Sequence, residues 1–185
     1  MRIRRQARSV GTAVYKGASH SYSRAPRGRY LYRHAHCGRF SLNYAVVHCT
    51  QGHKIADALA KRHVAAMSGP LISERCKPEL HELTPATPGI LQKAGVRISI
   101  ITDHPVIPIQ YLPICAGLAV REGLPYEAAL RAITLTPAEI CGISSRVGSI
   151  EPGKDADFSL FPCDPLTIAA KPALVVGGGE ILYQA

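Results

Sequence analysis

Two polar side chains stand at the ends of short apolar segments of the chain. His48 closes the apolar run of residues 44–48, and Asp103 follows the run of residues 96–102. In folds built from parallel strands and helical crossovers, the carboxyl ends of the strands form the active face. An imidazole and a carboxylate at such positions can bind a divalent metal or transfer a proton. These two residues are therefore the first candidates for chemistry, and we expect their side chains to converge to within about 10 Å.

The segments around these residues alternate between strand-like and helix-like patterns. Short apolar runs bounded by Gly and Pro predict buried parallel strands, and apolar residues at helical spacing predict helices. The expected strands are residues 44–48, 64–68 and 96–102. The expected helices are residues 52–62, a helix capped by Thr84 or Thr87 that ends at residue 93, and residues 109–122, 125–133 and 137–141. This order predicts βα units and an α/β fold with a parallel sheet.

The pattern changes after residue 145, where short strand-like runs are separated by Gly and Pro. The expected strands there are residues 147–150, 156–161, 173–176 and 180–183. No helical spacing of apolar residues accompanies them. The sequence therefore predicts a small β-rich appendage over residues 146–185.

The beginning of the chain is strongly basic. Residues 1–56 hold 11 Lys and Arg and no acidic residue, whereas the rest holds 11 basic and 13 acidic residues, so the net charge of +9 comes from this head. Residues 1–33 show no sustained hydrophobic period, which predicts a disordered extension. The alternative is a nucleic-acid-binding arm, since Arg and Tyr can contact phosphates and bases. No nucleic-acid-binding motif accompanies the charge, so nucleic acid is the less favoured partner.

The composition favours a cytoplasmic location. No run of about 18 apolar residues is present to span a membrane, and the N-terminus lacks the apolar region of a secretory signal. An Arg- and Ser-rich start also resembles an organelle transit peptide, which is a weaker interpretation. The six cysteines form no CxxC pair, and we expect them to be free thiols in a reducing compartment.

Several segments between residues 34 and 185 together resemble the amidohydrolase superfamily, and in particular its imidazolonepropionase-like group. They are VHCTQGHKIADALA, GPL, TPGILQKAGVRISIITDHPVIPIQYLPICAGLAV and LTPAEICGISSRVGSIEPGKDADFSLF. The resemblance implies metal-dependent hydrolysis of a non-peptide C–N bond, of the cyclic amide type, in a small-molecule substrate. It also implies a partial TIM-type (β/α) barrel over residues 34–145, followed by a composite β-rich appendage over residues 146–185.

The resemblance further implies a metal site, with zinc as the expected ion. His48 matches the histidine ligand of the sixth barrel strand, and Asp103 matches the carboxylate of the eighth strand, as metal ligand and general base. His36, in the stretch HAH, matches the histidine of the fifth strand. His53 and His104 flank these ligands and are expected to contact substrate. A carboxylate beside a metal-bound water can take its proton during attack on a carbonyl carbon.

Each site residue also has a structural alternative. His48 would then be a hydrogen-bonded histidine at a strand end, and Asp103 would only begin the turn before Pro105. His53 would be a surface residue near the start of a helix.

The chain departs from the family pattern in two respects. The family carries an HxH pair on its first barrel strand, and the neighbours of HAH at residues 34–36 do not support placing it there. Only 12 positions separate His36 from His48, which is too few for a helical crossover and a strand. A TIM barrel takes about 250 residues, with about 200 as a lower range, whereas this chain has 185. We therefore expect a truncated or rearranged chain, weakly active or inactive alone. The alternatives are a non-enzymatic remnant and a fragment that pairs with a second copy or a complementing chain.

Overall fold

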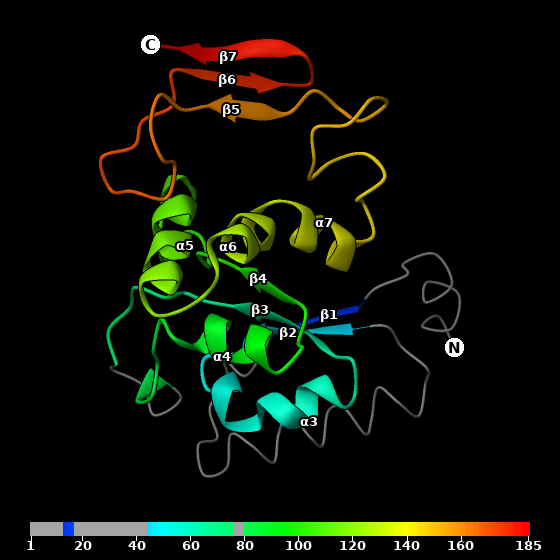
Figure 1. Ribbon diagram of the computed structural model, residues 1–185, viewed down its shortest axis with the longest axis vertical. Helices are drawn as coiled ribbons and strands as arrows, with labels where there is room; N and C mark the ends of the chain where they lie inside the picture. Colours follow the sequence, from blue (N-terminus) through cyan, green and yellow to red (C-terminus); the bar gives the residue numbers. More distant parts are fainter. Residues whose placement is uncertain (1–12, 17–43, 76–79) are drawn as a thin grey trace.

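The structure is a computed structural model that describes residues 13–16, 44–75 and 80–185, and Figure 1 shows its elements. The strands are β1 (Ala13–Lys16), β2 (Tyr44–His48), β3 (Ala65–Ser68), β4 (Ile98–Ile100), β5 (Phe158–Leu160), β6 (Leu174–Gly177) and β7 (Glu180–Gln184). The α-helices are α3 (Ala56–Ala60), α4 (Thr87–Lys93), α5 (Leu112–Arg121), α6 (Tyr126–Ile133) and α7 (Leu135–Cys141). Two 3-10 helices, η1 (Gly52–Ile55) and η3 (Ile109–Tyr111), precede α3 and α5.

The first four strands form one parallel sheet in the order β1-β2-β3-β4. All residues of β3 and β4 are buried, and so is the centre of β2. Strands covered on both faces form continuous apolar runs, which explains why the pattern predicted them. The predicted parallel sheet is confirmed. The last strand is shorter than the expected residues 96–102, because the Val96 N–H donates to the Leu91 carbonyl and so belongs to the end of α4.

Alternate residues of the strands face two different clusters of apolar side chains. One face packs against helices α3 to α6, and its cluster includes Val46, Ala66 and Ile98. The other face carries the strand residues Ala45, Val47, Ala65 and Met67, which form a cluster with Ile140 of α7. Both faces of the sheet therefore carry buried apolar side chains. Among the described residues, no helix is both long and apolar enough to span a membrane.

Strand β1 lies inside the segment that the sequence predicted to be a disordered extension. Ala13 to Lys16 pair in parallel with Tyr44 to Val47 of β2. The expectation of disorder is wrong for these four residues, because a short run containing Val and Tyr can add to the edge of a neighbouring strand without any longer period. The other residues of the segment 1–33 lie outside the described residues, as does His36, and the boundary at residue 33 stays a prediction.

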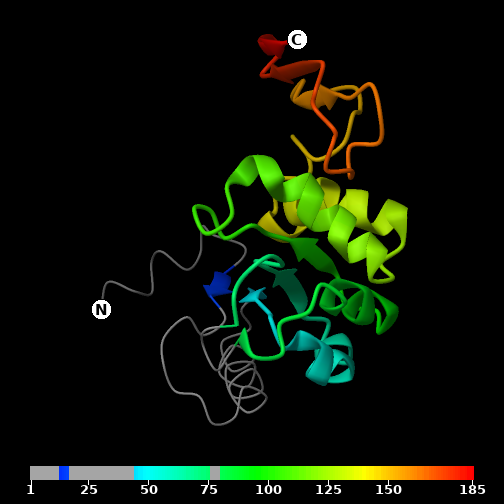
Figure 2. The same ribbon diagram turned by 90° about the vertical axis from the view of Figure 1, so that its left-hand side faces the viewer.

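The last three strands form a separate antiparallel sheet in the order β5-β6-β7. Figures 1 and 2 show α5, α6 and α7 between this sheet and the parallel one. The prediction of a strand at residues 147–150 is wrong. The N–H groups of Arg146 and Val147 both donate to the Ile143 carbonyl, so the chain there continues the turn that follows α7.

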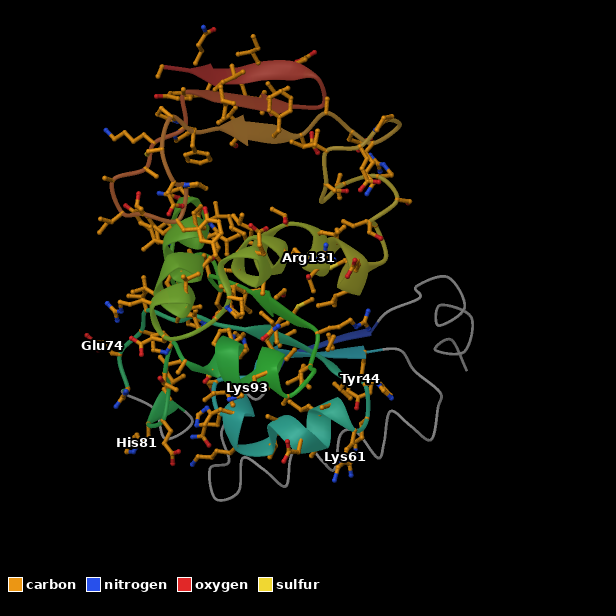
Figure 3. The ribbon with its side chains drawn as sticks, in the orientation of Figure 1. Tyr44, Lys61, Glu74, His81, Lys93 and Arg131 are labelled. Atoms are coloured by element: carbon orange, nitrogen blue, oxygen red, sulfur yellow. The ribbon has the colours of Figure 1, made fainter. Side chains whose placement is uncertain are left out.

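Helices α6 and α7 are joined across their surfaces by an ion pair. Arg131 of α6 lies 3.5 Å from Glu139 of α7, measured between Nη2 and Oε1, and Figure 3 labels Arg131 at α6. The Arg131 side chain is exposed and the Glu139 side chain is half-buried. A pair of this kind contributes at most about 1 kcal/mol to stability, so the apolar clusters hold these helices in place.

Gly117 of α5 is expected to resist replacement by alanine. A Cβ atom there would lie 2.1 Å from the Leu166 carbonyl oxygen, which belongs to the segment between β5 and β6. Alanine in a helix is normally more stable than glycine by about 0.5–1 kcal/mol. Here we expect Gly117→Ala to lower the free energy of unfolding by about 1–3 kcal/mol, measured by urea denaturation. Gly89→Ala in α4 is the comparison and should cost less, because the nearest backbone atom to a Cβ there is 3.1 Å away instead of 2.1 Å. A Gly117→Ala variant at least as stable as wild type would contradict this close contact.

Candidate functional site

His48 and Asp103 lie together at the carboxyl ends of the parallel strands. His48 is the last residue of β2, and Asp103 follows β4 by three residues. The distance from His48 Nδ1 to Asp103 Oδ2 is 3.8 Å, and the two side chains are 13% and 35% exposed. In Figure 3, Tyr44 marks the opposite end of β2, and Glu74 lies in the loop that follows β3. The predicted convergence of these two side chains is confirmed.

The backbone around both residues is in an uncommon conformation. His48, Cys49 and Asp103 have φ values of 69°, 39° and 54°. For residues other than glycine such values cost on the order of 1–3 kcal/mol, and they cluster at active and ligand sites. They turn the chain sharply where β2 ends and beyond β4. The same turns place the imidazole and the carboxylate against each other.

Two contacts with Gly69, the residue after β3, fix the position of His48. The Nδ1 atom of His48 is 3.2 Å from the Gly69 carbonyl oxygen. The Gly69 N–H donates to the His48 carbonyl oxygen at 3.1 Å. Gly69 belongs to the segment GPL that carries the family resemblance, but it was not among the predicted site residues. A Gly-Pro pair directly after an apolar strand was the available signal, since glycine is needed where the backbone adopts a positive φ.

Among the described residues, neither His53 nor His104 is grouped with the His48–Asp103 pair as a possible metal site. His53 lies on η1, where its Nδ1 is 2.9 Å from Thr87 Oγ1 at the start of α4. Its neighbour Lys54 forms an ion pair with Glu82. His104 is exposed next to Asp103, and His36 lies outside the described residues. The substrate contacts of His53 and His104 therefore stay predictions.

The pH dependence of stability should carry a contribution from His53. Burial lowers the pKa of His53 below 6.5; Glu82 opposes this shift, and Lys54 adds to it. The unfolded chain therefore binds the proton at a higher pH than the folded chain. His53 therefore does not lower the free energy of unfolding above about pH 6.5. Below that pH the free energy of unfolding falls, until the pH reaches the pKa of His53 in the folded chain. We expect His53→Gln to reduce the loss of stability on acidification, measured by urea denaturation at several pH values. His81→Gln, at an exposed position, is the control, and identical profiles for His53→Gln and wild type would contradict the expectation.

Burial makes Cys49 and Cys115 poorly suited to act as nucleophiles. Burial raises the pKa of Cys49, the residue after His48, to about 12. Burial also raises the pKa of Cys115 on α5. A thiol must lose its proton to bind a metal or attack a substrate. Both residues therefore serve as small apolar side chains of the core.

The donor atoms of His48 and Asp103 fit part of a divalent metal site. Imidazole nitrogen and carboxylate oxygen are both common zinc ligands, and here the two side chains lie side by side at strand ends with part of their surface exposed. Within residues 13–16, 44–75 and 80–185, no three His, Cys, Asp or Glu side chains are grouped to hold a metal. The described part of the chain thus offers two candidate ligands, whereas a catalytic zinc requires about three protein ligands.

Known proteins share both the sequence and the fold of this chain. The model of the amidohydrolase family matches residues 33–182. The chain is 35% identical over 99 residues to amidohydrolase tasK of Hapsidospora irregularis, and the matched region covers 54% of this chain and 10% of that protein. The chain is also 56% identical over 48 residues to the urease subunit alpha of Staphylococcus aureus, and this region covers 26% of this chain and 8% of that protein.

Two solved structures show the same arrangement of elements. An amidohydrolase from Thermotoga maritima MSB8 superposes with a TM-score of 0.82 at 34% identity, over 86% of this chain and 42% of that one. An adenosine deaminase from Xanthomonas campestris with bound zinc superposes with a TM-score of 0.60 at 27% identity, over 81% of this chain and 40% of that one. The chain spans less than half the length of each of these relatives. Because the family model matches most of this chain, the chain belongs to the amidohydrolase family.

Proposed function

We propose that the chain carries part of a metal-dependent amidohydrolase site that hydrolyses the C–N bond of a cyclic amide or a related small molecule. The observation that carries the proposal is the approach of His48 and Asp103 to 3.8 Å at the carboxyl ends of the sheet. Family membership supports the reaction class. The zinc named for the deaminase of X. campestris supports zinc as the ion.

His48 and Asp103 would act in different ways. A bound zinc ion supplies a water with a pKa near 7 and polarises the carbonyl of the substrate. His48 is the more buried of the two, and its contacts with Gly69 suit it to a fixed ligand. Asp103 is the more exposed, which suits a carboxylate that both holds the metal and accepts the proton of the attacking water.

Three further histidines complete the proposal. His36 is proposed as a third ligand, on the family pattern alone. His104 is a proposed substrate contact, supported by its exposure beside Asp103. His53 is a weaker proposed contact, since its ring is hydrogen-bonded to Thr87. Because the described residues supply only two ligands, we propose that the isolated chain binds zinc weakly and turns substrate over slowly at most.

Zinc titration of the purified chain by calorimetry, together with hydrolysis assays on cyclic amides, tests this proposal. We expect weak binding that Asp103→Asn reduces further, with little turnover. Asp57→Asn on the exposed side of α3 is a matched control that should bind zinc as wild type does. Zinc binding unaffected by Asp103→Asn would refute the site. Tight binding with turnover abolished by Asp103→Asn would instead show that the chain holds a complete catalytic site.

A further inference from the structure

Two hydrogen bonds join Gly69 to His48, one between main-chain groups and one from the His48 ring to the Gly69 carbonyl. The Gly69 N–H donates to the His48 carbonyl oxygen at 3.1 Å, and the Gly69 carbonyl oxygen lies 3.2 Å from Nδ1 of the His48 ring. One residue of the neighbouring strand end thus fixes both the main chain and the side chain of His48. Such a double contact leaves the ring little freedom to rotate.

The position of Gly69 admits no side chain. Its φ is +152°, and a Cβ atom there would lie 1.9 Å from the carbonyl oxygen of Ile101. Ile101 directly follows β4 and is itself held by the hydrogen bond from its N–H to the Ser68 carbonyl oxygen, at 3.0 Å. Ile101 stands two residues before Asp103. Gly69 is therefore packed between the chain segments that carry the two candidate ligands.

The contact with Gly69 also decides which ring nitrogen of His48 carries the proton. A backbone carbonyl oxygen can only accept a hydrogen bond, so Nδ1 must be the donor. The Asp103 carboxylate oxygen, at 3.8 Å from Nδ1, is too distant for a hydrogen bond. In the neutral ring, protonated Nδ1 leaves the lone pair on Nε2. A metal ion binds the nitrogen with the lone pair.

We propose that Gly69 is a positioning residue of the site, which holds His48 as the Nδ1-protonated tautomer and leaves Nε2 as the metal-binding nitrogen. The inference rests on the proposed metal site for its consequence, since the contact itself exists without metal. Hydrogen bonds from a ligating histidine to a backbone carbonyl fix the ring orientation and tautomer in many metal sites. The absence of a side chain at Gly69 is what brings this carbonyl within reach.

The direct test measures the tautomer in the metal-free chain. A long-range nitrogen–proton correlation spectrum of the 15N-labelled full chain reports which ring nitrogen is protonated, and the His48 signals are those that disappear in His48→Gln. We expect Nδ1 to carry the proton at neutral pH, and zinc to change the signal of Nε2. A His48 ring protonated at Nε2 would overturn the proposal.

A variant pair tests the consequence for metal binding. We expect Gly69→Ala to mix the two tautomers and to weaken zinc binding by about 10–100-fold. Gly95→Ala is the matched control: Gly95 also has a positive φ, of +87°, but a Cβ there meets no atom within 4 Å. A folded Gly69→Ala variant with wild-type tautomer and affinity would overturn the proposal. If that variant does not fold, the wild-type spectrum alone decides.

The two proposals fail in distinguishable ways. A His48 ring protonated at Nδ1 whose Nε2 signal does not respond to zinc would refute the metal site and leave the positioning by Gly69 standing. A ring protonated at Nε2 that nevertheless responds to zinc at Nδ1 would refute the role of Gly69 and leave the metal site standing.

Discussion

Zinc at 100 times its dissociation constant is expected to raise the free energy of unfolding of the chain by about 2.7 kcal/mol, and His48→Gln is expected to remove most of this gain. A ligand that binds the folded chain and not the unfolded chain stabilises the fold by mass action. The glutamine side chain keeps polarity at position 48 but lacks the imidazole nitrogen. The stabilisation should also disappear when a chelator is added.

Urea denaturation with and without zinc measures this effect. The six cysteines and eight histidines of the unfolded chain also bind zinc, which reduces the stabilisation in every variant. The informative quantity is therefore the difference between variants. His81→Gln removes an exposed histidine and should retain the wild-type response. Equal zinc stabilisation in His48→Gln and His81→Gln would contradict the assignment of His48.

Leu91→Ala is expected to lower the free energy of unfolding by about 2–5 kcal/mol. Leu91 of α4 has no exposed surface and belongs to the main core cluster. A Cβ atom at Gly52 would lie 3.3 Å from Leu91 Cδ1 and 2.4 Å from Cys49 Sγ, so the leucine packs against the turn that follows His48. Removing its methyl groups leaves a cavity under that turn.

The same urea experiment includes two controls for Leu91. Leu91→Met conserves most of the volume and should cost less than about 1.5 kcal/mol. Ile90→Ala shortens the neighbouring side chain of the same helix, which is 42% exposed, and should cost less than Leu91→Ala. A loss no larger for Leu91→Ala than for Ile90→Ala would show that the core does not depend on this contact.

Much of the parallel sheet could be predicted because its signals are local. Residues 44–48 form a strand with the expected bounds, since an apolar run buried on both faces differs from its surroundings at every position. The convergence of His48 and Asp103 followed from one topological rule, that parallel strands place their carboxyl ends on one side of a sheet. That rule needs only the strand type and the position of each residue.

The features that escaped prediction depend on contacts between distant segments. Strand β1 is four residues long and pairs with β2, whose first residue lies 28 positions beyond Lys16, so no local period marks it. Residues 147–150 are apolar enough for a strand, but hydrogen bonds to Ile143 bend the chain into a turn. The contacts of Gly69 with His48 require a positive φ next to a particular neighbour. A sequence pattern shows the glycine and not the neighbour.

The strand order β1-β2-β3-β4 also fixes when the site can appear during synthesis. Each strand pairs with the one before it in the chain, so the sheet can grow by addition at one edge as the polypeptide leaves the ribosome, N-terminal segments first. Gly69 can contact His48 as soon as β3 has emerged, whereas Asp103 arrives only with the segment after β4. A nascent chain stalled between these two points would hold an oriented histidine without its carboxylate. The proposed metal site would then be complete only after the segment that follows β4 has emerged.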